Sequence, residues 1–156
     1  LVSMYGKCGY MNDADDVFYS TCVRDVVSWT ALIEAYASHG YVEVVIDLLV
    51  KMQYEGVKPD KITYMTVLSS CSHAGWVDEA CRQFKSMTED YAIPHTIEHY
   101  GCMLDLYGRI GQLEEAEKLM LGMPFPPNDV MWEILHSACQ IHHDLERGRA
   151  AGEESS

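Results

Sequence analysis

Residues 26–60 read VVSWTALIEAYASHGYVEVVIDLLVKMQYEGVKPD, a pattern that predicts two short amphipathic helices and a closing turn. In the first helix, expected at about Ser28 to Ser38, apolar residues recur every three or four positions, which is the helical period. Gly40 ends this helix, because glycine readily takes the left-handed conformation. A second helix, expected at about Val42 to Glu55, stops before Pro59, since proline cannot continue a helix.

Imperfect copies of this helix pair fill the rest of the chain. The glycines that end a first helix are Gly9, Gly40, Gly75 and Gly111, which lie 31, 35 and 36 residues apart, and His143 takes the same place 32 residues later. Small or apolar residues recur five and nine positions after the glycines: Ala14, Val45, Ala80 and Ala116, then Phe18, Leu49, Phe84 and Met120. Agreement at so many offsets indicates an internal repeat.

The repeat divides the chain into units. We expect a truncated unit at residues 1–25, a complete one at 26–60, two more at 61–96 and 97–128, a partial unit at 129–148 and a polar tail at 149–156. Each unit would bury its apolar stripe against its neighbours. The predicted fold is therefore all-α, a right-handed α-solenoid of antiparallel helix-turn-helix repeats. First helices would line its concave surface and second helices its convex surface.

Composition and cysteine usage agree with a packed helical protein. The chain is 48% hydrophobic, yet no run approaches the roughly 18 apolar residues of a membrane-spanning helix. None of the six cysteines forms a CxxC pair. Cys71, Cys102 and Cys139 lie among apolar residues in predicted helices, so we expect buried, reduced thiols rather than a disulfide framework.

The formal net charge of −13 is unfavourable for simple nucleic-acid binding, which requires basic residues to neutralise phosphate. The acidic residues are unevenly placed, however. They concentrate on the predicted second helices: Asp13, Asp15, Asp16, Glu43, Asp47, Asp78, Glu79, Glu114, Glu115 and Glu117. We expect these carboxylates to form a solvated convex layer, which leaves the concave layer close to neutral.

The strings RDVVSWTALIEAYASHG (24–40), ITYMTVLSSCSHAGWVDEA (62–80), IEHYGCMLDLYGRIGQLEEAEKLM (97–120) and MPFPPNDVMWEILHSACQIHHDLERG (123–148) resemble the pentatricopeptide repeat family. The resemblance covers Met4 to about Gly148 and is to the plant class that mixes normal, long and short repeats. In that pattern the units are short, normal, long and short, followed by the start of an E-type extension. We therefore expect the carboxyl-terminal part of a longer protein.

The resemblance implies sequence-specific binding of single-stranded RNA, one base per repeat, in chloroplasts or mitochondria. The family's two base-contacting positions match Thr30 and Asp60 here, and this combination resembles the one that prefers guanine. Val27 and Ile62 match the positions that clamp the base between apolar side chains. The alternative is that Thr30 is an ordinary exposed helix residue and that Asp60 only caps the next helix.

The other units give weaker expectations. In the third unit the matching residues are Met65 and Thr96, a pair without good base-edge chemistry. In the fourth unit they are Gly101 and Asn128, where only the asparagine can form a side-chain hydrogen bond. The first unit supplies Asp25, whose partner position precedes the sequence. We therefore expect one base to be read clearly.

Proteins of this class often supply the address for a zinc deaminase in RNA editing, but the HxE and PCxxC motifs of such a deaminase do not occur here. Cys139 and His143 are four residues apart on a predicted helix, yet no further ligands complete a metal site. We expect no metal, no other cofactor and no enzymatic activity.

A different class of function remains open from the sequence. Units 61–96 and 129–148 could form a helical scaffold that docks editing-complex proteins, such as a DYW-type deaminase or MORF proteins, through the acidic charge. A tetratricopeptide-like peptide binder is disfavoured, because that repeat holds a constant period of 34 residues.

Overall fold

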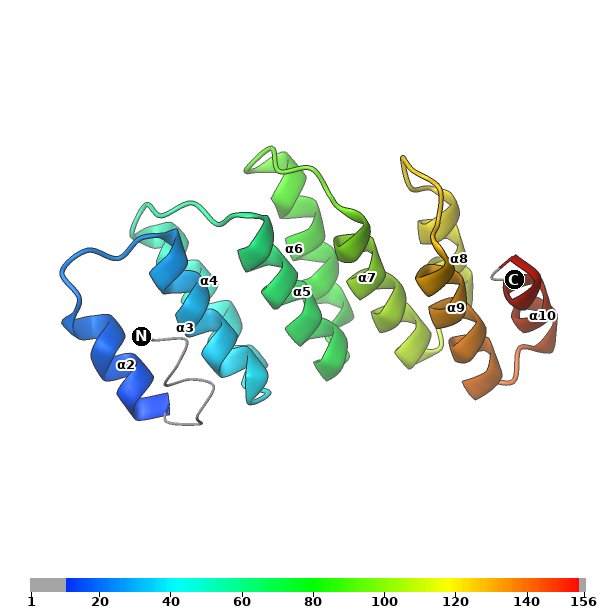
Figure 1. Ribbon diagram of the computed structural model, residues 1–156, viewed down its shortest axis with the longest axis horizontal. Helices are drawn as coiled ribbons and strands as arrows, with labels where there is room; N and C mark the ends of the chain where they lie inside the picture. The colour runs from blue at the N-terminus through cyan, green and yellow to red at the C-terminus, as the bar shows by residue number, and fades with distance from the viewer. Residues whose placement is uncertain (1–10, 155–156) are drawn as a thin grey trace.

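The computed structural model describes residues 11–154 as a row of antiparallel helix pairs, without a β-strand in that range (Figure 1). The first helices of the pairs are α3 (Val26–Ser38), α5 (Lys61–Ala74), α7 (Ile97–Ile110) and α9 (Asp129–Ile141). The second helices are α2 (Met11–Ser20), α4 (Val42–Tyr54), α6 (Val77–Glu89), α8 (Leu113–Leu121) and α10 (Leu145–Glu154). The predicted all-α solenoid is confirmed. Over the same residues, no helix is long and apolar enough to cross a membrane.

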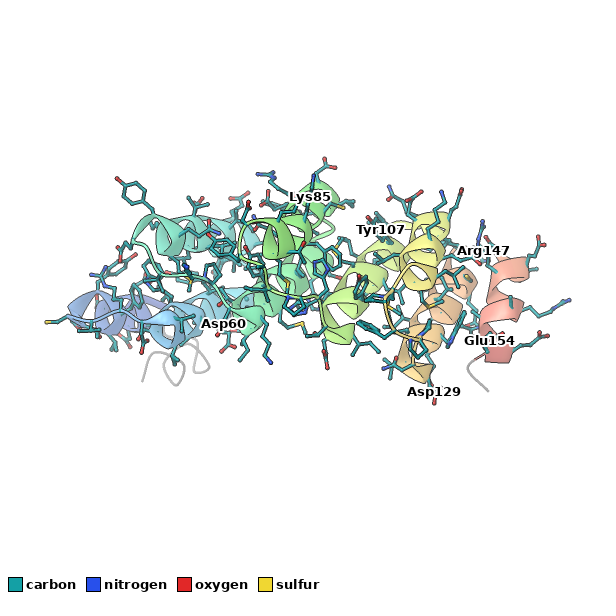
Figure 2. The ribbon with its side chains drawn as sticks, turned by 90° about the horizontal axis from the view of Figure 1, so that it is seen from above. Asp60, Lys85, Tyr107, Asp129, Arg147 and Glu154 are labelled. Atoms are coloured by element: carbon teal, nitrogen blue, oxygen red, sulfur yellow. The ribbon has the colours of Figure 1, made fainter. Side chains whose placement is uncertain are left out.

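The two layers of the solenoid differ in how closely their helices approach. In the first-helix layer, α3 contacts α5, α5 contacts α7 and α7 contacts α9. Between residues 11 and 154, no second helix contacts another second helix. Helices α4, α6 and α8 each lie against their own first helix and the first helix of the next unit, whereas α2 contacts α3 and α10 contacts α9. Figure 2 shows α4, α6 and α8 on one side of the row and α3, α5 and α9 on the other. Because the first helices are more closely spaced, they form the concave side.

The repeat positions found in the sequence fill the core. Ala14, Val45, Ala80 and Ala116 are fully buried, as expected where two helices approach closely. Trp29 and Tyr64 are also fully buried, and each such side chain stabilises the fold by about 1.5–3 kcal/mol. Between residues 11 and 154, most of the buried apolar residues belong to two clusters, and α7 contributes Leu106 to one and Leu104 to the other. The core therefore continues through α7.

Each first helix ends in the left-handed conformation that the sequence markers predict. Gly40, Gly75 and Gly111 have φ values of +78°, +73° and +79°, and His143 has a φ of +60°. A histidine rarely takes this conformation, because its Cβ crowds the backbone. The sequence correctly placed His143 as the fifth marker; Gly9, the first, lies outside the described residues.

The carboxyl-terminal end differs from the expected polar tail at 149–156. Helix α10 continues to Glu154 and packs on α9, and Ala151 is only 1% exposed. Its contact depends on small residues: a Cβ added at Gly148 would lie 3.2 Å from the Cβ of Cys139. A buried helix is normally predicted from its large apolar residues. Helix α10 has small residues at its contact with α9 instead, so its burial was not predicted.

The cysteine environments agree with inert thiols. Cys71 and Cys139 are fully buried, and Cys102 is partly buried. Burial raises the pKa of Cys71 to about 12 and that of Cys102 to about 11, so both remain protonated at neutral pH. Cys22 is exposed, and Cys8 lies outside the described residues.

Two glycine substitutions should have opposite effects on stability. Gly40→Ala should lower the free energy of unfolding by about 1 kcal/mol, because alanine is strained at a φ of +78° although nothing lies within 4 Å of an added Cβ. Gly101→Ala, inside α7 with equal open space, should raise it by about 0.5–1 kcal/mol. Urea unfolding followed by circular dichroism measures both. Equal effects at the two positions would contradict the conformational assignment.

Candidate nucleic-acid interface

Four polar residues lie at the amino-terminal ends of the first helices. Asp25, Asp60, Thr96 and Asn128 are the N-caps of α3, α5, α7 and α9. In Figure 1 these helix ends follow one edge of the solenoid. Figure 2 shows Asp60 in the first-helix layer and Lys85 of α6 on the opposite side. The last residue of each unit therefore lies beside the concave layer.

Asp60 caps α5 through a single carboxylate oxygen. Its Oδ1 accepts hydrogen bonds from the backbone nitrogens of Ile62 (3.0 Å) and Thr63 (2.9 Å) and from the Thr63 hydroxyl (3.0 Å). The Asp60 backbone N–H donates in return to Thr63 Oγ1 at 3.3 Å, which completes a capping box. Within residues 11–154, all hydrogen bonds found for this carboxylate use Oδ1. The capping role therefore leaves Oδ2 available to another donor.

Thr30 is buried, at 8% exposure, and is not the ordinary exposed helix residue of the alternative interpretation. Its Oγ1 lies 2.8 Å from Oγ1 of Thr63. Thr63 thus connects Thr30 of α3 to Asp60 at the start of α5. Sequence reasoning missed Thr63; its position three residues after an N-cap, the spacing of a capping box, was the available signal.

Apolar side chains project beside this network. Val27 is 70% exposed and Ile62 is 53% exposed, and each is the second residue of its first helix. Val130 occupies the same position in α9 and is 58% exposed, although the sequence analysis did not single it out. Glu98 takes that position in α7 and interrupts the row.

Of the remaining predicted residues, Asp25 and Asn128 are capping groups without an equivalent network, and Gly101 has no side chain to form one. Asp25 Oδ1 accepts from the backbone nitrogen and the hydroxyl of Ser28, both at 2.9 Å, and these bonds hold the pKa of Asp25 below its usual value. Asn128 is exposed, and its Oδ1 accepts from the Met131 backbone nitrogen at 3.0 Å. Gly101 lies on α7 with nothing within 4 Å of an added Cβ. Among the predicted pairs in the described part of the chain, the structure therefore links Thr30 and Asp60 alone through side chains.

At the start of α7 a histidine takes the place that Thr63 has in α5. His99 Nδ1 accepts from the Thr96 backbone nitrogen at 3.0 Å, so the ring proton is on Nε2, which donates to the Lys61 carbonyl at 2.9 Å. His99 is 1% exposed, and burial lowers its pKa. The neutral ring therefore ties the start of α7 to α5.

The lowered pKa makes stability depend on pH. As the pH falls through 6.5, the ordinary pKa of His99, the unfolded chain takes up a proton that the folded chain does not yet bind. The free energy of unfolding should therefore fall between about pH 7 and about pH 5. His99→Gln keeps capping-box chemistry without this titration, so it should reduce that fall. Urea titrations at several pH values measure it, with the exposed His73→Gln as control. Equal effects of both variants would contradict the assignment.

Histidines near the carboxyl-terminal end serve packing. His142 Nε2 forms a 2.8 Å hydrogen bond with the Gly108 carbonyl, which joins the end of α9 to α7. In the part of the chain that the structure describes, no three His, Cys, Asp or Glu side chains are grouped so that they could hold a metal ion.

The repeats match known families. The family model described as "PPR repeat family" matches residues 24–73, and the model described as "PPR repeat" matches residues 1–22, 62–91 and 98–124. A putative pentatricopeptide repeat-containing protein of Arabidopsis thaliana is 48% identical over 153 residues, or 98% of this chain and 21% of the relative. Another Arabidopsis pentatricopeptide repeat-containing protein, described as chloroplastic, is 43% identical over 99% of this chain and 20% of its own length.

Solved structures share the fold. The pentatricopeptide repeat protein PPR10 from maize is similar with a TM-score of 0.85 at 22% identity, covering 99% of this chain and 23% of that chain. PPR10 in complex with an 18-nt psaJ RNA element is similar with a TM-score of 0.75 at 23% identity, covering 94% of this chain and 22% of that one. The chain thus spans about a fifth of the length of the relatives it matches. Its repeats match the family models over most of its residues, and the chain belongs to the pentatricopeptide repeat family.

Proposed function

We propose that this chain binds single-stranded RNA along its concave layer and that residues 26–60 read one guanine through Thr30 and Asp60. The observation that carries the proposal is the hydrogen-bonded series Thr30–Thr63–Asp60, which lies between two units and beside the exposed side chains of Val27 and Ile62. A polar pair flanked by apolar surfaces suits a base that is stacked on its faces and hydrogen-bonded at its edge.

Each part of this arrangement has a role in the proposal. Val27 and Ile62 contact the two faces of the base, and stacking of this kind contributes about 1–3 kcal/mol per base with aromatic partners. Asp60 Oδ2, which is not used in capping α5, accepts from the N–H groups on the guanine edge. Asp25, Gly101 and Asn128 lie at the corresponding positions of other units and read bases less selectively.

Local charge makes the site more favourable for RNA than the net charge suggests. Lys58 and Lys61 flank Asp60 and are exposed, and neither forms an ion pair with a residue of the described region. The exposed carboxylates Glu43, Asp47 and Glu114 belong to second helices, on the other layer. In the proposed complex the lysines contact phosphate, so binding is weakened by salt.

The wider setting of the proposal follows from the relatives. We assign the units to the plant class with short, normal and long repeats, with an E-type extension from residue 129. The protein then acts in RNA editing or another RNA-processing step in a chloroplast or mitochondrion, and the chloroplastic relative supports that setting. The repeats supply RNA recognition, and a partner supplies the chemistry.

Asp60→Asn tests the base assignment. Asparagine caps a helix as well as aspartate, so the free energy of unfolding should change little. The substitution places an NH₂ donor where Oδ2 accepted a hydrogen bond. The preference of the site for guanine over the other bases should therefore fall about tenfold, equivalent to about 1.4 kcal/mol. Enrichment from a randomised single-stranded RNA pool at low salt measures the preference at each position.

Asp47→Asn on α4 is the matched control, because it removes the same charge from an exposed residue of the opposite layer. It should leave the base preference unchanged and raise overall affinity slightly. An unchanged guanine preference in Asp60→Asn would overturn the assignment of Asp60.

A second candidate function is protein docking, which the exposed carboxylates of the convex layer favour. Reversing charge at the exposed residues Asp78 of α6 and Glu146 of α10, in units 61–96 and 129–148, should reduce capture of an editing-complex partner, such as a DYW-type deaminase or a MORF protein, by several-fold at low salt. Glu34→Lys, an exposed change on α3, is the control and should have little effect. Pull-down with purified partner measures capture. An equal loss in the control would show that layer position is irrelevant.

A further inference from the structure

The hydroxyl of Thr63 has a complete set of hydrogen-bond partners. A threonine hydroxyl has one proton to donate and two lone pairs to accept. An ionised carboxylate can only accept, so the 3.0 Å bond to Asp60 Oδ1 uses the Thr63 proton. The Asp60 backbone N–H donates to one lone pair at 3.3 Å. The second lone pair is left for Thr30, whose Oγ1 is 2.8 Å away.

This count determines the direction of the bond between the two threonines. Because the Thr63 proton is already used on Asp60, Thr30 must be the donor. The Thr30 proton therefore points to Thr63 and away from any ligand. Only lone pairs of Thr30 Oγ1 remain for a base, and Asp60 Oδ2 also offers only lone pairs.

A site made of two acceptors distinguishes the four bases. On its Watson–Crick edge, guanine presents two neighbouring N–H donors, at N1 and N2. Adenine and cytosine each present a donor beside an acceptor, and uracil presents one donor between two acceptors. Only guanine satisfies two acceptors side by side, since the other bases would place a lone pair against a lone pair.

We propose that Thr63 is a positioning residue that sets the specificity of the base site, because it holds the Thr30 hydroxyl as an acceptor. The inference rests on the proposed RNA-binding function and extends it: the two residues facing the base do not alone determine which base is preferred. Thr63 is fully buried, and its effect is transmitted through Thr30 and Asp60.

Of the equivalent residues in two other units, one shares this bond to the N-cap and one does not. Ser28 has a hydroxyl that donates to Asp25 at 2.9 Å, the same bond that Thr63 makes to Asp60. Met131, in the same place on α9, has no hydroxyl and contacts Asn128 only through its backbone nitrogen. Where the residue equivalent to Thr63 lacks a hydroxyl, no neighbouring bond fixes which base-contacting group donates and which accepts. We therefore expect such units to read bases less selectively.

Thr63→Val tests the inference, since valine has nearly the same shape without the hydroxyl. The Thr30 proton is then free to turn toward the base, and the site presents a donor beside an acceptor. Preference for guanine over adenine and cytosine should fall about tenfold, the loss of one net hydrogen bond of about 1.4 kcal/mol. The measurement is enrichment from a randomised single-stranded RNA pool, with thermal unfolding to confirm that the variant is folded.

Further variants separate positioning from a structural effect. Thr63→Ser keeps the hydroxyl and should keep the guanine preference. Thr66→Val, on the same helix, removes a hydroxyl that donates only to the Ile62 carbonyl at 3.2 Å, and should change nothing. The double change Thr30→Val with Thr63→Val should lose the new binding of adenine and cytosine, because no hydroxyl remains to donate. Thr63→Ala replaces Thr63→Val if valine impairs folding.

The outcomes distinguish the two proposals. If the unaltered chain prefers guanine and both Thr63→Val and Thr63→Ala keep that preference, the positioning role is wrong while the proposed function stands. If the unaltered chain shows no base preference, the proposed reading of guanine fails, and the role of Thr63 fails with it. A tenfold loss in Thr63→Val that Thr63→Ser does not share supports both.

Discussion

Direct packing of first helix against first helix is the contact on which the rest of the molecule depends. A single helix pair cannot bury both sides of its first helix, so α5 requires α3 on one side and α7 on the other. The fully buried ring of Trp29 packs edge-on against Phe18 of the preceding unit, with ring centroids 4.6 Å apart. The resulting spacing brings the first turn of α5 within hydrogen-bonding distance of Thr30 on α3.

The same packing joins stability and recognition. Asp60 ends one unit and caps the first helix of the next, so the residue that faces a base in the proposed complex also stabilises α5. The two tasks are compatible because the carboxylate has two oxygens and capping uses one of them. Thr63 links both tasks, since its hydroxyl completes the capping box and contacts Thr30.

The layered arrangement also explains how an acidic chain can present a site suited to RNA. Exposed carboxylates such as Glu43, Asp47 and Glu115 belong to the second helices, which do not contact one another along the described part of the chain. Their distance from the first-helix layer, together with screening by salt, limits their effect on a bound phosphate. Lys58 and Lys61 lie next to Asp60 instead.

Much of the fold could be predicted because the repeat contains residues with strong conformational preferences at fixed positions. Periodic apolar positions predicted the helices, and Gly40, Gly75 and Gly111 marked their ends, as their positive φ values confirm. Helix α10 was missed because Gly148 and Ala151 are buried by close approach, which leaves no large apolar residue in the sequence to detect. Thr63 was missed because its bond to Thr30 joins two units.

The sequence by itself determined the α-solenoid, the carboxyl-terminal ends of its first helices and the membership in a repeat family, because these follow from local periodicity and from motifs within each unit. Only the tertiary structure decided that Thr30 is buried, that Asp60 uses one oxygen for capping and that Thr63 joins the two. The physical reason is that hydrogen bonds between units depend on distances of a few tenths of an ångström. Those distances are set by how whole helices pack, and no single stretch of sequence specifies them.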